Sequence, residues 1–369
     1  SLSQKNRDSQ CQTLSIHLVQ NMSNASVNAI AWFNYVNVQM NRYFPIPFIV
    51  LGTIGVILNT IIFTRRNLFQ NSCVQYLLGN TLSNLIVLYW VALTRIFSDG
   101  YNNDLSVRSD TFCKIRYFLT YFSRALSTWF IVLACCDRWL SSTQARNRYN
   151  TVIFARQLMA VTCIVCFLAF FHVLFLFGVQ TSSTSVTCYA RSGIYRLLSD
   201  LQYLTFYALG PPILMLIFGL LTLKNLRNSR RLVLPNNQNL TSAKQRSIQR
   251  RDNQLLMMLL LQVMIIILFT LPFAIQKLVD TFIQKSNQTP VQKAQYDLIA
   301  GILRLISYGS HAFGFFFYTL SAKIFRNELL RVINRIYQCF AGKDLISPAR
   351  TDIFGGITRR NDIDMTQTV

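Results

Sequence analysis

Seven apolar segments, each long enough to cross a membrane as a helix, constrain this chain more than any other feature. A helix needs about 20 residues to span a hydrocarbon core. Only 14% of the residues are charged, whereas soluble proteins average about 25%. The sequence therefore predicts an all-α membrane protein built as a seven-helix bundle. The expected helices lie at about Tyr43–Thr64, Val74–Phe97, Phe112–Leu140, Leu158–Val179, Leu201–Leu223, Leu255–Phe282 and Ala294–Tyr318.

The distribution of basic residues predicts how the bundle is oriented. A formal net charge of +22 could suggest a nucleic-acid partner, but Lys and Arg concentrate around Arg65, Arg138 and Arg230 and in the C-terminal tail. Positive loops mark the cytoplasmic face of a membrane protein. We therefore expect the N-terminus outside the cell and no nucleic-acid partner. Glycosylation sequons at Asn21 and Asn24 agree, since the sugar is attached on the outer side.

The stretch after the seventh segment has a different character from the bundle. Its apolar residues recur at helical spacing opposite Lys323 and Arg326, which is typical of an amphipathic helix lying on membrane lipids. Cys339 is a candidate for palmitoylation, with an unmodified thiol as the alternative. The expected regions are an extracellular segment, the bundle, a cytoplasmic amphipathic helix and a disordered tail, at residues 1–42, 43–320, 321–340 and 341–369.

Two motifs at opposite ends of the third segment narrow the class of membrane protein. Asp137-Arg138-Trp139 stands at its inner end. Cys113 precedes Arg138 by a helical length of roughly 37 Å, which places it at the outer mouth. Cys188 falls in the long outer loop after the fourth segment, and both cysteines face the oxidising side. We expect a Cys113–Cys188 disulfide that tethers this loop over the bundle.

With further residues in the same order, these motifs resemble the rhodopsin-like (class A) family of G-protein-coupled receptors. The resemblance covers about Tyr43 to Phe340, and the chain looks similar to divergent invertebrate neuropeptide receptors. Asp137-Arg138-Trp139 resembles the family's Asp-Arg-Tyr motif. Further matches are the asparagine of the first helix, the proline of the sixth and the tyrosine that closes the seventh, at Asn59, Pro272 and Tyr318.

The resemblance implies a receptor at the plasma membrane that switches between two states. An extracellular ligand favours the state in which the inner end of the sixth helix moves outward, and a heterotrimeric G protein binds in the opened cleft. At rest, Arg138 is held by Asp137 and by Asp252 at the inner end of the sixth helix. The alternative is that Asp252 is a solvated loop charge. We expect no cofactor and no metal.

Several positions depart from the family pattern. Asn84 replaces the usual aspartate of the second helix, Thr270 replaces the tryptophan of the sixth, and residues 314–318 lack the family's Asn-Pro-x-x-Tyr. The resemblance implies a sodium pocket that depends on the aspartate of the second helix, because a hard cation needs anionic oxygen ligands, and Asn84 and Ser127 bring no negative charge. The sequence therefore predicts that sodium does not affect ligand affinity.

Single positions in the outer half of the bundle narrow the ligand class. Thr120 stands where amine receptors carry an aspartate, and Tyr308 stands where opsins carry the lysine that binds retinal, so amine and retinal ligands are not expected. The loop around Cys188 alternates as a short hairpin does, which is the form such loops take in peptide receptors.

Charge within the bundle is costly, so each intramembrane charge is a candidate functional group. We expect three of the basic residues, Arg95, Arg116 and Lys277, to reach water along their stems. Arg124 lies about three turns into its helix and is not expected to reach bulk water, and Arg304 is intermediate. These residues, with Asp99, Asp200 and Asp280 as the few nearby acids, indicate a peptide ligand with an anionic group.

Three other functions fit parts of the sequence. An anion transporter or channel would use Arg124 and Arg304, although no acidic residue falls in the middle of an expected helix, as ion-coupled transport usually requires. An enzyme is not expected, because His172 and His311 have no partner placed for catalysis and are expected to be buried and hydrogen-bonded. A chemosensory seven-helix receptor for a volatile ligand remains an alternative.

Overall fold

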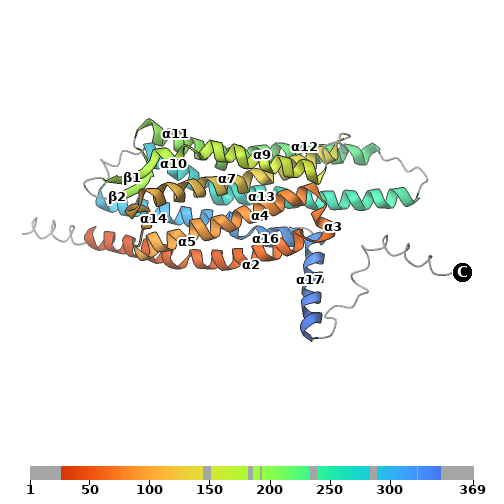
Figure 1. The fold of residues 1–369 in the computed structure, drawn as a ribbon, viewed down its shortest axis with the longest axis horizontal. Helices are drawn as coiled ribbons and strands as arrows, with labels where there is room; N and C mark the ends of the chain where they lie inside the picture. The colour runs from red at the N-terminus through yellow and green to blue at the C-terminus, as the bar shows by residue number, and fades with distance from the viewer. Residues whose placement is uncertain are drawn as a thin grey trace, which may run out of the picture.

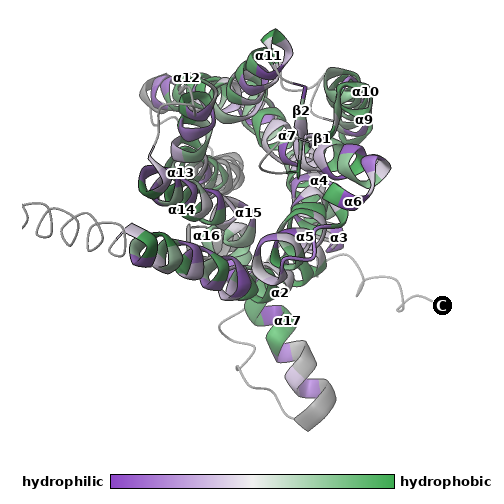
Figure 2. Cartoon of the chain, turned by 90° about the vertical axis from the view of Figure 1, so that its left-hand side faces the viewer, coloured by the Kyte–Doolittle hydropathy of each residue, from purple (hydrophilic) through white to green (hydrophobic). Residues whose placement is uncertain are grey.

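The chain folds into an elongated bundle of helices that lie side by side (Figure 1). Viewed end on, the helices form a ring (Figure 2). Six helices in the described part of the chain are long and apolar enough to cross a membrane: Ser26–Phe63, Ser72–Gly100, Asp110–Ser142, Val152–Leu176, Ile194–Asn228 and Gln254–Asp280. The computed structural model describes residues 26–143, 151–181, 186–191, 193–232, 239–282, 289–321 and 323–341.

The elements of the first half are α2 (Pro45–Phe63), α3 (Arg66–Phe69), α4 (Ser72–Ile86), η1 (Val87–Ala92), α5 (Leu93–Arg95), η2 (Ile96–Gly100), α6 (Leu105–Arg108), α7 (Asp110–Ser142), α9 (Val152–Phe170) and α10 (Val173–Leu176). Those of the second half are β1 (Phe177–Thr181), β2 (Val186–Ala190), α11 (Ile194–Tyr203), η3 (Leu204–Leu209), α12 (Gly210–Leu232), α13 (Asn239–Phe282), α14 (Pro290–Ser307), α15 (Gly309–Ala312), α16 (Gly314–Ser321) and α17 (Lys323–Ala341). The segments η1, η2 and η3 are π-helical.

The seventh membrane helix consists of three pieces, α14, α15 and α16, which lie beside the other helices (Figure 1). The expected helix at about Ala294–Tyr318 is therefore present, but it is interrupted at Tyr308 and Phe313. Serine hydroxyls donate to the backbone carbonyls of Arg304 and Ser307 beside the first break, and such bonds bend helices.

The first membrane helix begins at Ser26 rather than at the expected Tyr43. Its outer part is held by neighbours, since Arg42 donates through Nη2 to the carbonyl of Gly100 at 2.8 Å. Asn37 lies so close to Gly301 of α14 that a Cβ on the glycine would come within 2.6 Å of the amide oxygen. Part of the expected extracellular segment is therefore helical. The sequons at Asn21 and Asn24 lie outside the described residues.

A two-stranded hairpin follows the fourth membrane helix. β1 and β2 pair antiparallel with Val179 opposite Cys188. Helix 4 ends at Leu176 instead of the expected Val179, because residues from Phe177 onward form β1. The predicted Cys113–Cys188 disulfide is confirmed and joins β2 to the first turn of α7, with a Cα–Cα distance of 5.8 Å. It holds the hairpin across one end of the bundle, called the hairpin end below.

The outer surface and part of the interior of the bundle differ from those of a soluble protein. Large apolar side chains at mid-helix are exposed, among them Leu168 at 64%, Leu220 at 61% and Leu268 at 69%. Polar side chains such as Asn84 and Ser127 are buried at 4% and 3%. An apolar outer surface around a partly polar interior is what a lipid environment favours. The fold is thus the all-α membrane bundle that the sequence predicts.

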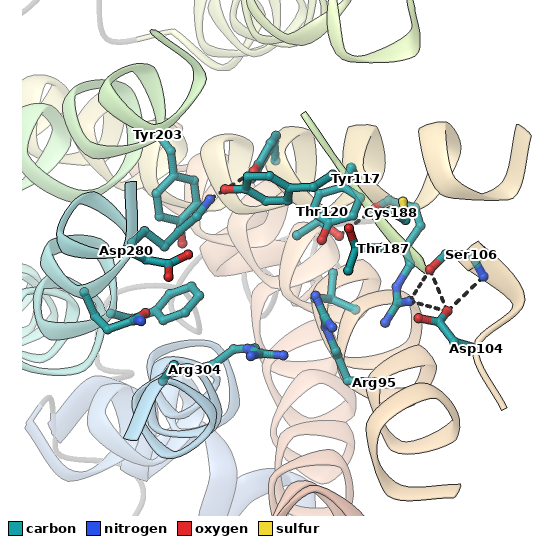
Figure 3. A pocket seen from close by; sticks show the side chains of 18 of the residues that line it. Arg95, Asp104, Ser106, Tyr117, Thr120, Thr187, Cys188, Tyr203, Asp280 and Arg304 are labelled. Carbon is teal, nitrogen blue, oxygen red and sulfur yellow. Dashed lines mark hydrogen bonds and ion pairs between the residues drawn. The ribbon is translucent and has the colours of Figure 1, made fainter. Parts of the chain in front are cut away.

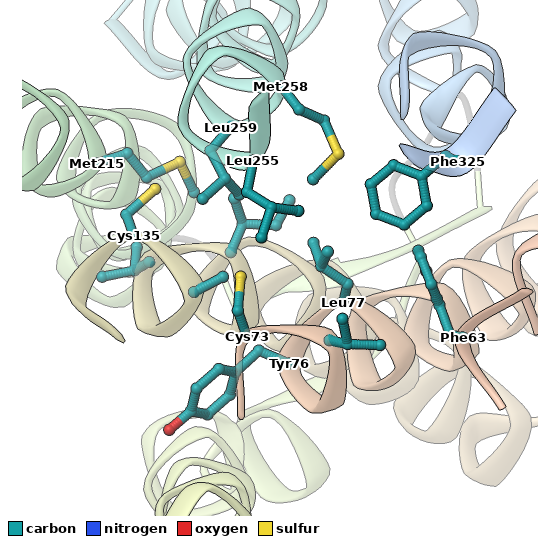
Figure 4. Close-up of a cluster of buried hydrophobic side chains, with 14 of the residues drawn as sticks. Phe63, Cys73, Tyr76, Leu77, Cys135, Met215, Leu255, Met258, Leu259 and Phe325 are labelled. Atoms are coloured by element: carbon teal, nitrogen blue, oxygen red, sulfur yellow. The ribbon is translucent and has the colours of Figure 1, made fainter. Parts of the chain in front are cut away.

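The predicted amphipathic helix is present as α17, which runs across the direction of the bundle helices (Figure 1). Phe325 at its start is 1% exposed and packs edge-on against Phe63, with ring centroids 5.5 Å apart. Both belong to a hydrophobic cluster that also takes in Leu77 of α4 and Leu255 of α13 (Figure 4). This cluster closes the bundle at the end opposite the hairpin, called the α17 end below.

Candidate functional site

A cavity of about 410 Å³ opens at the hairpin end of the bundle (Figure 3). Residues of η1, α5, α7, β2, α11, α13 and α14 line it, so most of the bundle contributes to its wall. The lining is strongly basic, with three acidic residues, Asp104, Asp280 and Asp297, against six basic ones. The basic residues are Arg95, Arg116, Arg124, Arg196, Lys277 and Arg304.

Two of these arginines share one carboxylate. Arg304 Nη1 lies 2.8 Å from Asp99 Oδ2, and Arg95 Nη1 lies 3.3 Å from the same oxygen. Arg95 comes from the second membrane helix and Arg304 from the seventh, and Figure 3 shows their side chains directed toward each other. Asp99 therefore joins the two helices at the wall of the cavity.

Two other cations are each paired with an acid of their own. Arg116 is 4% exposed, and its Nη1 lies 3.0 Å from Asp104 Oδ1 and 2.9 Å from Ser106 Oγ. Arg196 Nη2 lies 3.0 Å from Asp280 Oδ2. Both pairs link neighbouring elements near the mouth of the cavity.

Lys277 of α13 is surrounded by tyrosines. Its Nζ donates to the hydroxyl of Tyr121 at 3.0 Å, lies 3.2 Å from Asp200 Oδ1, and sits 4.4 Å from the ring centroid of Tyr203. Such cation–π contacts hold a desolvated ammonium group in place. The expectation that Arg95, Arg116 and Lys277 reach water is wrong for Arg116, which is buried. The side chains of Arg95 and Lys277 keep exposures of 22% and 12%, and each is also bound to an acid within the protein.

Arg124 differs from every other cation of the cavity. It is 2% exposed, and its contacts are neutral: Nη1 donates to the hydroxyl of Tyr203 at 3.0 Å and Nη2 to Ser307 Oγ at 3.4 Å. Its guanidinium carbon lies 5.1 Å from the ring centroid of Tyr308. Its Nε has no hydrogen-bond partner among the described residues. Arg124 is thus a buried cation without a described carboxylate contact.

Below Arg124, a chain of hydrogen bonds enters the middle of the bundle. The hydroxyl of Tyr207 lies 3.1 Å from His311 Nε2, and His311 Nδ1 lies 2.9 Å from Asn84 Oδ1. Ser127 Oγ lies 2.7 Å from Asn84 Oδ1 and 2.8 Å from Asn80 Oδ1, so its one proton can be donated to either amide oxygen. A neutral imidazole with its proton on Nδ1 satisfies these contacts. The ring centroid of Tyr207 lies 5.9 Å from the guanidinium carbon of Arg124, so this polar chain begins beside a residue of the cavity wall.

The α17 end holds the Asp-Arg-Trp motif. Arg138 is 4% exposed, and its Nε donates to Asp137 Oδ2 at 3.2 Å while its Nη2 donates to Asn71 Oδ1 at 3.3 Å. Trp139 stacks obliquely on Phe218 of α12, with centroids 5.6 Å apart. The basic side chain of the motif is thus turned into the bundle.

Comparison with known families decides the class of this protein. The model of the family described as 7 transmembrane receptor (rhodopsin family) matches residues 55–308, which is more than half of the chain. The chain belongs to the rhodopsin family of seven-transmembrane receptors. Among curated proteins, none matches this receptor.

The five residues predicted to line the ligand site of this receptor all lie on the cavity wall: Thr120, Arg124, Lys277, Arg304 and Tyr308. Two other predicted residues lie away from the cavity. Asn59 is buried in the bundle at 5% exposure, whereas Pro272 lies within the length of α13 with its side chain exposed. Both histidines are hydrogen-bonded, as expected, with His172 Nδ1 2.7 Å from the hydroxyl of Tyr195. The side chains of three further predicted residues, Asp252, Tyr318 and Cys339, lie outside the described part of the chain.

Several residues of the site were not predicted. Asp104 was missed because it lies in the connection before α7 and meets Arg116 only through the fold. Tyr203 and Tyr207 were missed although a signal was present, since two tyrosines four residues apart in an apolar helix place two hydroxyls on one face.

Proposed function

We propose that this receptor binds an extracellular peptide with an anionic group and transmits the signal to a heterotrimeric G protein at the plasma membrane. The observation that carries the proposal is Arg124. A charged side chain at the centre of a membrane helix costs about 2.5–3.5 kcal/mol on insertion scales. In this receptor the described contacts of Arg124 are hydroxyls and aromatic rings. A ligand carboxylate would supply the missing negative charge and accept from the unpartnered Nε.

The proposed orientation places the hairpin end outside the cell. A disulfide persists in an oxidising compartment, and Cys113–Cys188 lies at that end. The basic amphipathic helix α17 lies at the other end, as expected on the cytoplasmic leaflet. A cavity of about 410 Å³ suits the terminal residues of a peptide, with the remainder of the chain resting on the hairpin.

The proposed signal passes through outward movement of α13. This helix contributes Lys277 to the cavity and Leu255 to the hydrophobic cluster at the α17 end. One helix therefore reaches from the proposed ligand site to the proposed cytoplasmic side. Pro272 interrupts its backbone bonding between the two sites. Arg138, buried against Asp137 and Asn71, fits a closed resting state.

A peptide-library screen tests the proposal. Cells expressing the receptor with a promiscuous G protein are read by calcium release, and hits are repeated on Arg124→Ala and Arg304→Ala. The matched control is Arg42→Ala, since Arg42 binds a backbone carbonyl outside the cavity. We expect anionic peptides as hits, with their response lost in Arg124→Ala and kept in Arg42→Ala at equal surface expression.

Two outcomes would contradict the proposal. Hits that lack an anionic group and act equally on Arg124→Ala would remove the role of Arg124. Anion currents that need no G protein would favour a channel or transporter instead of a receptor.

A further inference from the structure

The cavity holds excess positive charge at two separate depths. The deeper is at Arg124, whose side chain is buried at 2% exposure. The shallower is at Arg95 and Arg304, whose side chains are 22% and 23% exposed and share Asp99 as their common carboxylate. Two guanidinium groups on one carboxylate leave one positive charge unbalanced at this position.

Neighbouring acids do not cancel the excess within the cavity wall. Asp104 is bound by Arg116, Asp280 by Arg196, and Asp200 by Lys277. Asp297, the remaining acidic residue of the lining, is exposed to solvent, where charge is screened.

The two positions meet at α14 of the seventh membrane helix. Arg124 Nη2 contacts Ser307 Oγ, and that hydroxyl donates to the carbonyl of Arg304 at 2.6 Å. Ser307 is the third residue after Arg304 in α14, a rise of roughly 4.5 Å along the helix axis. One small ligand segment can therefore reach both positions.

The shallow position has donors to spare. Arg95 and Arg304 both reach Asp99 through Nη1, and Arg95 also shares a side-chain hydrogen bond with Tyr117. Other N–H groups of both guanidinium groups take no part in the contact with Asp99. A guanidinium carries five N–H donors in a planar fork that matches a carboxylate.

We infer that the ligand carries two separate anionic groups, one bound at Arg124 and the second between Arg95 and Arg304. This inference rests on the proposed function and specifies its ligand as a dianion. A peptide that ends in an acidic residue, with its terminal carboxylate beside a side-chain carboxylate, has this chemistry.

Matched small anions test the inference without the natural ligand. The purified receptor is titrated with succinate, glutarate, adipate and pimelate, with the monomethyl ester of each, and with inorganic phosphate, at constant ionic strength. Binding is read from the rise in melting temperature. Each ester differs from its diacid by one negative charge, so the pair isolates the second anionic group.

We expect at least one diacid to bind about tenfold or more tightly than its ester, since a charge-assisted contact contributes at least this factor. Arg304→Gln should reduce the diacid to the affinity of its ester and leave the ester unchanged, while Arg304→Lys keeps part of the difference. Arg124→Gln should remove binding of both compounds, and Arg42→Gln should remove neither.

An Asp99→Asn variant should have the opposite effect to Arg304→Gln on the preference for diacid over ester. Without the shared carboxylate, Arg95 and Arg304 carry two unbalanced charges, and the preference for diacid over ester should grow.

The outcomes separate this inference from the proposed function. Equal affinity of a diacid and its ester would overturn the two-group inference and leave Arg124 as an anion site. The same follows if phosphate, which carries its charge on one centre, binds as tightly as the best diacid. Absence of binding by any carboxylate would contradict both.

Discussion

At the residue scale, Arg124 is kept at a cost to stability. A buried charge without an opposite charge is destabilising, and replacement of buried ionic groups by apolar ones of similar volume is often neutral or stabilising. Arg124 is enclosed by Tyr203, Tyr308 and Ser307, which are neutral. A bound anionic ligand would supply the opposite charge and reduce this destabilisation.

This imbalance predicts that Arg124→Met makes the empty receptor more stable. The variant should melt a few degrees higher than the wild type, because it removes a buried charge and keeps the side-chain length. The measurement is thermal melting of the purified protein without ligand. A lower melting temperature would show that the guanidinium is already fully compensated.

His311 gives a second reason to expect that sodium does not bind beside Asn84, because its imidazole lies against the Asn84 amide. His311 Nδ1 lies 2.9 Å from Asn84 Oδ1, and His311 Nε2 lies 3.1 Å from the hydroxyl of Tyr207. Ser127 Oγ bonds the same amide oxygen of Asn84. Amide, hydroxyl and imidazole groups bring no negative charge to this position, while the imidazole takes up space between them.

We therefore predict that replacing sodium with choline leaves both the melting temperature and the ligand affinity of the receptor unchanged. A double variant, Asn84→Asp with His311→Ser, restores a carboxylate and frees the space, and it should gain a sodium-dependent rise in melting temperature. A sodium effect on the wild type would refute the account of this position.

How far the sequence predicts the site depends on the distance between partners along the chain. Asp99 follows Arg95 by one helical turn, so this pair is visible as i,i+4 spacing. The partnership of Asp99 with Arg304 joins helices far apart in sequence, and only the packed bundle reveals it. The burial of Arg124 could be predicted, because the number of helical turns from the outer end of the helix gives the depth of the residue in the membrane.

At the element scale, the sequence predicts the membrane helices from apolar length but not their interruptions. The expected seventh helix missed the breaks at Tyr308 and Phe313, because the serine back-bonds beside Tyr308 depend on side-chain rotamers. The hairpin could be predicted from the alternating residues around Cys188. The Cys113–Cys188 disulfide could be predicted because both cysteines lie on the outer side of the membrane.

The chain of bonds between η3 and α15 is a candidate path from the cavity to the interior. Tyr207 and His311 connect the fifth and seventh membrane helices, and His311 passes the connection to Asn84 on the second. Coupling through such networks typically amounts to 0.5–2 kcal/mol.

Two substitutions test this path. Tyr207→Phe and His311→Leu should each reduce ligand-stimulated nucleotide exchange by a factor of about 2 to 30, with ligand binding little changed. The double variant should be no worse than the more severe single variant, because both break one chain. Tyr89→Phe is the matched control, since its hydroxyl bonds Thr53 on the exposed side of the bundle. Additive losses would argue against a shared path.

At the scale of the whole molecule, the ligand cavity and the Asp-Arg-Trp motif lie at opposite ends of one bundle. Between them run polar contacts near the cavity and a hydrophobic cluster at the α17 end (Figure 4). Arg138 is buried against Asp137. Under the proposed function this is the closed resting state, and a ligand at the hairpin end would be needed to open the α17 end.

The sequence predicts a further restraint on this closed state at Asp252 of α13. If its carboxylate holds Arg138, Asp252→Ala should raise ligand-free signalling, because the resting state loses an ion pair. Basal nucleotide exchange measures the change, with Asp280→Ala at the hairpin end as a control for loss of an acid elsewhere on α13. Unchanged basal activity would leave Asp252 as a solvated charge.

The most direct test of the central claim crosses a change in the ligand with a change in the receptor. A peptide found in the screen is compared with its neutral amide form on the wild type and on Arg124→Gln, and the four affinities form a double-mutant cycle. We predict that neutralising the peptide weakens binding to the wild type about tenfold or more and leaves binding to Arg124→Gln unchanged. Equal losses on both receptors would show that Arg124 does not bind the anionic group.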